Sequence, residues 1–466
     1  MTMDLIARLN EWNERGEYDA ALRSAAAAVK ENDGDFALWI ALGNAFYGKK
    51  MYGDAERAYK KAETLNPSDP TAPSNLAGLF FETNRFEDGL TACDEALRRA
   101  PDALNALVHR GNMLSSLNRF DEALETYERA LRLSPGDDLT RFNQAYALSM
   151  TGQTDRAGEI YSGLLEKDPD NIEYLYAFAS FAERIGDAGR AAEIYLRLLK
   201  LKDEPSTHVT LAGCLYTLLL ADETDAVLRL TDEWLTAFPD NPVALHTLET
   251  LKNKDGAKRA SAEYVTELFD AFADSFDGVL ADLSYRAPEY VAEAVEKYDF
   301  PAPPAGLDLG CGTGLCGAAM RKRGIALASL TGVDLSEKML EKAAGRGVYT
   351  ELMQSDILTF LPARPAAFDV IVSSDVFTYL GDLSELFAGL AAALKPKGRL
   401  AFTVSECAEK ADGYVLGLSG RFRHGERYVR DGLEQNGLTV ESVVRVELRR
   451  ELDAPVAGLL VQAVKK

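Results

Sequence analysis

The segment Gly306–Gly314 joins a short apolar run to three closely spaced glycines. Gly310, Gly312 and Gly314 carry no Cβ atoms, so the backbone of a tight strand-to-helix corner can reach unusual dihedral angles and approach a ligand. Asp308 comes just before them, where its carboxylate could receive an ammonium group. The pattern predicts a cofactor site at this turn, with a purely structural turn as the alternative.

A second acidic residue narrows the choice of cofactor. Asp334 closes the next apolar run, at the distance where the end of a neighbouring parallel strand would offer an acceptor to two ribose hydroxyls. Nicotinamide dehydrogenases use the same logic, and Gly312–Gly317 has their glycine spacing. However, a carboxylate at Asp308 would repel a pyrophosphate and hold a methionine ammonium. We therefore favour S-adenosylmethionine.

Two later runs also end in carboxylates. Asp356 follows Ser355, where an acceptor for the adenine amino group is expected beside an apolar wall. Asp375 ends the run that begins at Phe368, and we expect it near both the cofactor and the methyl acceptor. Three neighbours of the acidic and glycine positions complete the predicted cofactor wall: Cys311, Leu335 and Ile357.

These motifs carry a family resemblance. The segments Leu307–Gly314, Val333–Asp334, Ser355–Asp356 and Leu394–Leu400 resemble class I S-adenosylmethionine-dependent methyltransferases, over roughly Glu263–Lys466. Three more segments resemble bacterial methyltransferases that carry tetratricopeptide repeats: Leu268–Asp277, Tyr285–Glu289 and Ser419–Tyr428. The resemblance implies a Rossmann-like α/β domain, residues 263–466, with a mostly parallel seven-stranded sheet and a terminal antiparallel hairpin.

The order of elements agrees with that fold. Apolar runs alternate with helical patterns from Leu327 to Ser405, which predicts a parallel sheet covered by helices. Ser336 is placed to cap its helix. Two final strands are expected at Thr439–Leu448 and Val456–Val464.

The residues before the sheet have helical periodicity from Tyr264 to Leu280. By resemblance, this lid helix, within residues 263–299, covers the cofactor and excludes water from it. Arg286 is the candidate partner of the cofactor carboxylate, with a surface ion pair as the alternative.

A basic cluster follows the fifth strand, in the predicted loop Ser405–Arg427. The usual pKa of a histidine suits the removal of a proton near neutral pH, so His424 is a candidate general base. Asp375, beside the expected acceptor, is the second catalytic candidate. A structural or solvated histidine is the alternative. Four neighbours could hold an anionic acceptor: Arg421, Arg423, Arg427 and Tyr428.

The first half of the chain is a repeat array. Prolines recur every 34 residues, at Pro67, Pro101, Pro135 and Pro169, and small residues recur in the same register. This is the signature of tetratricopeptide repeats, and we predict an all-α solenoid of six to seven repeats over residues 2–251. Residues 252–262 form the predicted linker.

The concave face of the array offers polar side chains to an extended peptide. We predict a peptide or protein partner there, although asparagine is common at these repeat positions. The candidate contacts are Asn44, Asn75, His109, Asn112 and Asn143.

Composition bounds the partners. The net charge of −22 disfavours sequence-independent binding to nucleic acid or to an anionic membrane. Five scattered cysteines and four distant histidines indicate free thiols and no metal site. We expect a cytoplasmic protein without a signal peptide or membrane span.

The sequence therefore predicts a methyltransferase whose acceptor, a small molecule or a protein recruited by the repeats, is unidentified. The alternative is an interaction scaffold with a non-catalytic cofactor-binding domain. The exit of the fourth strand, Ser373–Tyr379, lacks the Asn-Pro-Pro-Tyr sequence that grips planar amides and exocyclic amines.

Overall fold

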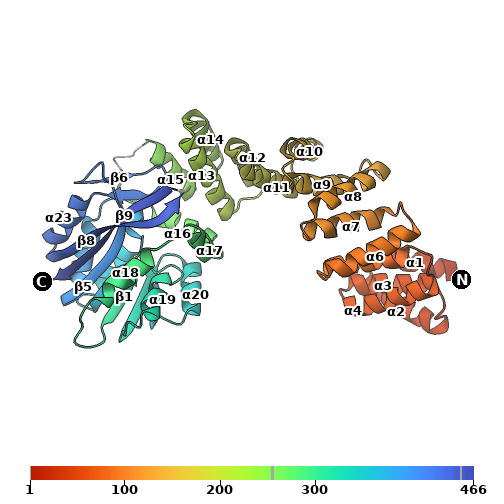
Figure 1. Cartoon of the computed structure of the whole chain (residues 1–466), viewed down its shortest axis with the longest axis horizontal. Coiled ribbons are helices and arrows are strands. Elements are labelled where there is room, and N and C mark those ends of the chain that lie inside the picture. The colour runs from red at the N-terminus through yellow and green to blue at the C-terminus, as the bar shows by residue number, and fades with distance from the viewer. Residues whose placement is uncertain (1, 253–256, 452–453) are drawn as a thin grey trace. The chain divides into compact units, whose positions relative to one another are not determined.

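The computed structural model describes residues 2–252, 257–451 and 454–466 (Figure 1). These residues form two compact units, Met1–Ile185 and Gly186–Lys466. Positions 253–256 of the predicted linker lie outside the described residues. Within the described ranges, none of the helices is both long and apolar enough to cross a membrane.

The first unit consists of paired antiparallel helices. Its helices are α1 Thr2–Glu14, α2 Tyr18–Glu31, α3 Phe36–Gly48, α4 Tyr52–Leu65, α5 Thr71–Glu82, α6 Phe86–Arg99, α7 Leu104–Ser116, α8 Phe120–Leu133, α9 Asp138–Met150, α10 Thr154–Lys167 and α11 Ile172–Arg184. The second helices of successive pairs begin 34 residues apart, at Tyr18, Tyr52, Phe86, Phe120 and Thr154. This confirms the predicted repeat array.

Small residues occur where the helices of a pair cross. A Cβ atom at Gly43 would lie 2.4 Å from the ring of Tyr59, and one at Gly111 would lie 2.4 Å from the ring of Tyr127. The two tyrosines are almost fully buried. In each of these helix pairs, the glycine leaves the space that the tyrosine ring of the partner helix fills.

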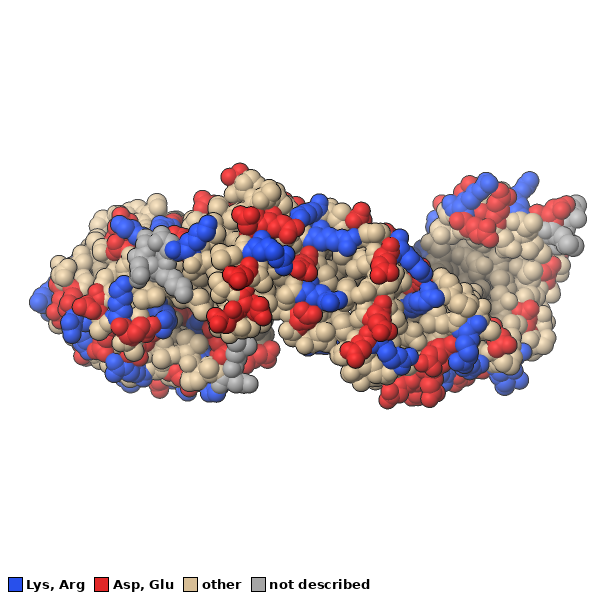
Figure 2. Space-filling model, turned by 90° about the horizontal axis from the view of Figure 1, so that it is seen from above, with Lys and Arg blue, Asp and Glu red and all other residues tan. Residues whose placement is uncertain are grey.

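Ion pairs tie the outer surface of this unit together. Arg99 contacts both Glu63 and Glu95 at 2.6 Å, and its own side chain is buried. On the face drawn in Figure 2, acidic and basic side chains are interspersed. Many carboxylates of this acidic chain therefore have a cation beside them.

The second unit begins with four more helices of the array and continues into the α/β domain. These helices are α12 Ala188–Leu201, α13 Pro205–Leu220, α14 Thr224–Ala237 and α15 Pro242–Lys252. Both α13 and α15 contact α16 (Ala262–Phe272). The last repeats therefore pack directly on the first helix of the domain that follows (Figure 1).

A seven-stranded sheet with the order β3-β2-β1-β4-β5-β9-β8 forms the centre of this domain. Its strands are β1 Ala305–Leu309, β2 Ser329–Asp334, β3 Glu351–Gln354, β4 Phe368–Ser373, β5 Leu394–Ser405, β8 Leu438–Glu451 and β9 Ala454–Lys465. Strands β1 to β5 pair in parallel, whereas β9 pairs antiparallel with both β5 and β8. The predicted parallel sheet with a terminal hairpin is confirmed.

Helices cover both faces of the sheet. They are α17 Phe276–Asp282, α18 Ala287–Glu296, α19 Leu315–Lys322, α20 Glu337–Gly345, α21 Ile357–Phe360, α22 Ser384–Ala393 and α23 Glu426–Gln435, with the short 3-10 turns η1 Leu361–Ala363 and η2 Phe377–Tyr379. Ser336 caps α20 as predicted, because its hydroxyl accepts from the Met339 N–H.

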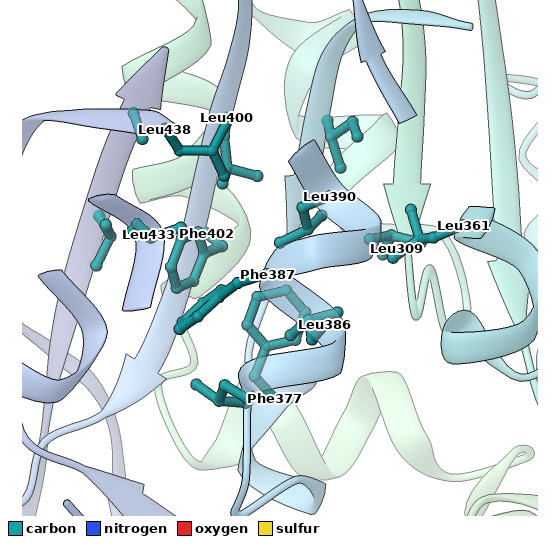
Figure 3. Close-up of a cluster of buried hydrophobic side chains, with 14 of the residues drawn as sticks. Leu309, Leu361, Phe377, Leu386, Phe387, Leu390, Leu400, Phe402, Leu433 and Leu438 are labelled. Atoms are coloured by element: carbon teal, nitrogen blue, oxygen red, sulfur yellow. The ribbon is translucent and has the colours of Figure 1, made fainter. Parts of the chain in front are cut away.

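Side chains of β4 alternate between two cores, as the period of a strand requires. Ile371 joins the cluster that includes Phe387 of α22 and Leu433 of α23, which Figure 3 shows. Val370 and Val372 join the cluster on the opposite face, under α18 and α19. Burial on both faces explains why the strand is a continuous apolar run.

Two sequence expectations are corrected here. The helical stretch expected from Tyr264 to Leu280 is two helices, because α16 ends at Phe272 and α17 begins at Phe276. The predicted loop Ser405–Arg427 contains a small antiparallel hairpin, β6 Tyr414–Leu416 and β7 Phe422–His424. Helix α17 and the two hairpin strands are too short for their periodicity to be recognised in the sequence.

Candidate active site

A cavity with a volume of about 160 Å³ lies where the parallel strands end. The glycine turn after β1 and the segments after β2, β3 and β4 form its floor. Helices α16 and α17 form its roof through Val265, Phe269, Phe276 and Leu280. The cavity is thus at the sheet edge where α/β folds bind ligands.

The glycine turn forms the floor of the cavity closest to β1. Gly310, Gly312 and Gly314 all have positive φ, at 64°, 54° and 89°. Gly310 and Gly312 line the cavity. A Cβ atom on Gly312 would meet nothing nearer than the ring of Phe276 at 3.9 Å, so it would occupy the space open to a ligand. Gly314 lies outside the wall and contributes the conformation that begins α19.

Asp334 is held in place by the same turn. Its carboxylate accepts the Gly312 N–H at 2.9 Å and the Ser336 N–H at 3.0 Å. Burial raises the pKa of Asp334, and these backbone donors oppose the rise. Asp334 lines the cavity next to Leu335 and Cys311. This aspartate therefore presents fixed acceptor oxygens to whatever fills the cavity.

Asp356 lies at the start of α21, after the adjacent strand β3. One of its oxygens accepts the Leu358 N–H at 2.8 Å, and the other accepts from Arg259 Nη2 at 2.7 Å. Asp356, Ile357 and Arg259 all line the cavity. Sequence reasoning placed Arg259 in the linker. In the structure it forms an antiparallel bridge with Leu380 and reaches the site.

Asp308 lies behind the glycine turn, outside the cavity wall. It is 1% exposed, and one of its oxygens accepts from the Tyr349 hydroxyl at 2.7 Å. The other oxygen is buried without a partner among the described residues. Burial raises the pKa of Asp308 to about 7. Its predicted contact with a cofactor ammonium stays a prediction.

The opposite end of the cavity is built from ion pairs. Asp375 has a positive φ of 58°, and its carboxylate pairs with Arg449 of β8. Arg449 also contacts Glu451 at 2.8 Å, and Glu451 contacts Arg421 at 2.5 Å. Asp375, Arg421 and Arg449 line the cavity. The result is a chain of alternating charges at the cavity wall.

Arg449 was not found by sequence reasoning. It occupies a strand in which exposed arginines are ordinary, and its side chain is nevertheless only 4% exposed. The signal that identifies it is the pairing with Asp375, which comes from a distant part of the chain and cannot be read from local patterns.

The prediction for Arg286 is corrected by the structure. Its guanidinium stacks on the ring of Tyr290, 4.8 Å from the ring centroid, and it is not among the residues that line the cavity. Its backbone N–H donates to the Leu448 carbonyl at 2.9 Å. Arg286 therefore fixes the start of α18 against β8.

The prediction of His424 as a general base is also corrected. His424 is fully buried in β7, and its Nε2 contacts the carbonyl oxygens of Leu380 at 2.8 Å and Gly381 at 3.2 Å. Burial lowers the pKa of His424 to about 4. Because His424 does not line the cavity, it has no path to an acceptor there. Its geometry is that of a structural link between the hairpin and the segment after β4.

Two other members of the basic cluster also point elsewhere. Arg423 pairs with Glu409, and Arg427 lies 3.9 Å from Asp412. Neither lines the cavity, so Arg421 is the member of the cluster that reaches it.

Comparisons with known proteins identify both parts of the chain. A methyltransferase-domain model matches residues 307–402, and tetratricopeptide-repeat models match residues 14–70, 75–138 and 114–180. The chain carries a methyltransferase domain and tetratricopeptide repeats. The matched methyltransferase segment spans β1 to β5 and includes the glycine turn, Asp334, Asp356 and Asp375.

Curated relatives of the methyltransferase domain match over part of their length. The chain is 34% identical over 131 residues to ubiquinone biosynthesis O-methyltransferase of Thiobacillus denitrificans, covering 26% of this chain and 53% of that protein. It is 35% identical over 108 residues to methyltransferase-like protein 27 of Homo sapiens, covering 22% and 43%. The chain spans about half the length of the curated relatives it matches.

Among solved structures, an S-adenosylmethionine-dependent methyltransferase from Mesorhizobium loti matches with a TM-score of 0.31. The two are 22% identical, and the match covers 37% of this chain and 95% of that one.

The polar residues predicted for the repeats lie in two equivalent pairs. The side-chain oxygen of Asn44, Oδ1, accepts from the Tyr59 hydroxyl at 2.8 Å and from the Asn75 side-chain amide at 3.0 Å. The Asn112 carbonyl oxygen accepts from both Tyr127 and Asn143, each at 2.9 Å. Part of each amide is thus used inside the array, and His109 Nδ1 is buried without a partner among the described residues.

Proposed function

We propose that this protein binds S-adenosylmethionine in the cavity and transfers its methyl group to an acceptor held beside Asp375. The observation that carries the proposal is the convergence of an open glycine turn and two separately anchored carboxylates, Asp334 and Asp356, on one cavity. The methyltransferase-domain match over the same residues supports it.

The residues present fit this cofactor. The space next to Gly312 admits ligand atoms where any other residue would place its Cβ. Asp334 would accept from two ribose hydroxyls, and Asp356 would accept from the adenine amino group between Ile357 and Arg259. When bound, the cofactor supplies a methyl group activated by a positively charged sulfur.

Asp375 would position the acceptor. One of its oxygens is held by Arg449, and the other is buried without a partner among the described residues. Because Asp375 lines the cavity, its carboxylate can accept from an O–H or N–H of the acceptor and hold the nucleophile in line. We favour an oxygen acceptor, because the curated relatives include proteins named O-methyltransferases.

The roof would exclude water. Phe269 packs edge-on against Tyr379, with ring centroids 5.4 Å apart, and against Phe276 at 5.8 Å. An aromatic roof over two carboxylates lowers the local dielectric and strengthens the interactions beneath it. The acceptor itself would be a small molecule or a protein brought by the repeats.

Calorimetric titration of S-adenosylmethionine into the full-length protein tests the cofactor site. Saturable one-to-one binding is expected, weakened about tenfold or more in Asp334→Asn. Asp369→Asn is the matched control, since Asp369 accepts from the Ala305 N–H and pairs with Lys395 outside the cavity. Absence of binding to the wild-type protein would refute the proposal and leave the scaffold function in its place.

The repeats would recruit a protein partner through their concave face. The two internal pairs do not use the side-chain oxygens of Asn75 and Asn143. They also do not use the side-chain NH₂ groups of Asn44 and Asn112. These groups match the donors and acceptors of an extended peptide backbone. His109 lies in the intervening repeat.

Two further assignments belong to this proposal. We place the domain boundaries at residues 2–251 and 263–466, and we place the protein in the cytoplasm. The second assignment is supported by five free cysteines, all buried.

A further inference from the structure

A histidine of the last repeat helix contacts two segments of the methyltransferase domain. His246 of α15 is 5% exposed, and its Nε2 lies 2.8 Å from the Gly420 carbonyl oxygen. A carbonyl can only accept, so Nε2 carries a proton. Burial lowers the pKa of His246, which favours the neutral tautomer with that N–H. The other ring nitrogen is buried without a partner among the described residues.

The same ring packs on the roof of the cavity. His246 stacks on Tyr264 of α16, with ring centroids 4.0 Å apart and planes inclined by 26°. Tyr264 is buried, and both the adjacent Val265 and Phe269, further along α16, line the cavity. His246 is therefore one of the contacts between the repeat helices and the helix that covers the site.

The contact with Gly420 leads to the other end of the cavity. Gly420 has a φ of 74° and its N–H donates to the Gly417 carbonyl at 3.0 Å, which closes the turn between β6 and β7. Arg421 follows directly and lines the cavity. A Cβ atom on Gly420 would lie 3.0 Å from His246 Nε2, so the turn and the histidine are fitted closely.

From these contacts we infer that His246 is a positioning residue of the methyltransferase site. It holds the turn that sets Arg421 and braces the helix that carries Val265 and Phe269. The last repeat helix then helps to position the residues of the methyltransferase site. This inference rests on the proposed function, because it concerns the same cavity.

Two substitutions in the full-length protein separate the two contacts. His246→Phe keeps a ring against Tyr264 and loses the N–H to Gly420. His246→Gln keeps an N–H donor and loses the ring. We expect hydrogen exchange in Tyr414–His424 to be about tenfold faster in the Phe variant, and exchange in α16 to be about tenfold faster in the Gln variant.

Cofactor binding provides the second measurement. The Gln variant should bind S-adenosylmethionine about tenfold more weakly, since the roof is loosened, while the Phe variant should stay within about twofold of the wild type. A purely structural role would lower the melting temperature of both variants and leave binding unchanged. Tyr59→Phe, which removes one buried hydrogen bond in the first unit, is the control and should change neither measurement.

Unchanged affinity in the Gln variant, or unchanged exchange in both His246 variants, would overturn the inference. Should either variant fail to fold, Gly420→Ala disturbs the same contact from the other side and should produce the exchange pattern of the Phe variant. A wild-type protein that does not bind the cofactor refutes the proposed function, whereas the exchange measurements still test whether His246 holds both segments.

Discussion

Asp334, at one end of the cavity, is held by backbone N–H groups of Gly312 and Ser336, both close to the motifs that predict them. Asp375, at the other end, is held by Arg449, 74 positions further along the chain. The first arrangement is local and belongs to the strand-turn-helix unit. The second depends on the terminal hairpin having formed in register.

This difference indicates how the two ends can vary. We call the Asp334 end, where we propose that the cofactor binds, the cofactor end, and the Asp375 end the acceptor end. A carboxylate held by backbone amides needs only the turn, so the cofactor end can be kept while the rest of the chain changes. A carboxylate held by a buried arginine depends on its partner, because removing one charge leaves the other uncompensated. We therefore expect the acceptor end to be the more fragile of the two.

Arg449→Met should show the largest effect. It leaves Asp375 buried without its cation, which we expect to cost about 3–5 kcal/mol in the free energy of unfolding. The measurement is urea denaturation. The double variant Arg449→Met, Asp375→Asn removes both charges and should recover most of the loss, and asparagine tolerates the positive φ at that position. Additive losses in the double variant would contradict the pairing argument.

Asp308→Asn should remove a pH dependence at the cofactor end. The folded-state pKa of Asp308 is raised to about 7, so its contribution to stability is complete below pH 3.8 and is lost as pH rises through about 7. A shift of this size corresponds to at most about 4 kcal/mol. The variant should match the wild type near pH 4 and exceed it at pH 8.

Urea denaturation of both proteins from pH 4 to pH 8 measures this prediction. The pH dependence comes from the buried carboxyl of Asp308. Asp369→Asn should therefore keep the wild-type dependence of the free energy of unfolding as the pH rises through about 7. Parallel curves for Asp308→Asn and the wild type would mean that Asp308 stays ionised in the folded protein.

The sequence predicted that the glycine turn, Asp334 and Asp356 meet at one edge of the sheet, and their binding of a cofactor stays a prediction. The glycines, Asp334 and Asp356 lie in contiguous motifs, and the geometry of each motif is fixed by a single strand and the turn after it. The repeat array could be predicted for the same reason, since each helix pair contacts the next at a constant offset. Contiguous motifs and a constant repeat length can be recognised in the sequence without knowledge of the rest of the fold.

The acceptor end could not be predicted in this way. His424 and Arg286 have suitable chemistry and neighbouring motifs, yet burial against carbonyl oxygens and stacking on Tyr290 direct them away from the cavity. Arg449 and Arg259 reach it from a hairpin and from the predicted linker. Which arginine reaches the wall is decided by strand register and packing across the domain, and no local pattern encodes that.

Gly310→Ala tests how closely the glycine turn is fitted against the segment after β4. Gly310 has a φ of 64°, and a Cβ atom there would lie 2.4 Å from Val376 Cγ2. We expect a loss of about 2–3 kcal/mol and cofactor binding weakened about tenfold or more. Gly437→Ala is the matched control, since Gly437 has a φ of 76° and no atom within 4 Å of the added Cβ.

The control isolates the backbone cost. Gly437→Ala should lose only about 1–2 kcal/mol, the cost of a left-handed conformation for a residue with a side chain, and should leave cofactor binding unchanged. Equal losses at the two positions would show that Val376 moves aside and that the turn is less tightly fitted than the structure indicates.

The smallest effect is expected from Arg259→Gln, which breaks the other arginine–aspartate pair of the cavity. Arg259 is 39% exposed and Asp356 is 23% exposed, whereas Arg449 is 4% exposed. Water screens the Arg259 pair, so we expect a change of less than about 1 kcal/mol that disappears in about 1 M salt, where the Debye length is near 3 Å. The Arg449→Met loss should persist at that salt concentration because its partner is buried. If the two losses were equal, or equally sensitive to salt, burial would not be what distinguishes the two ends of the cavity.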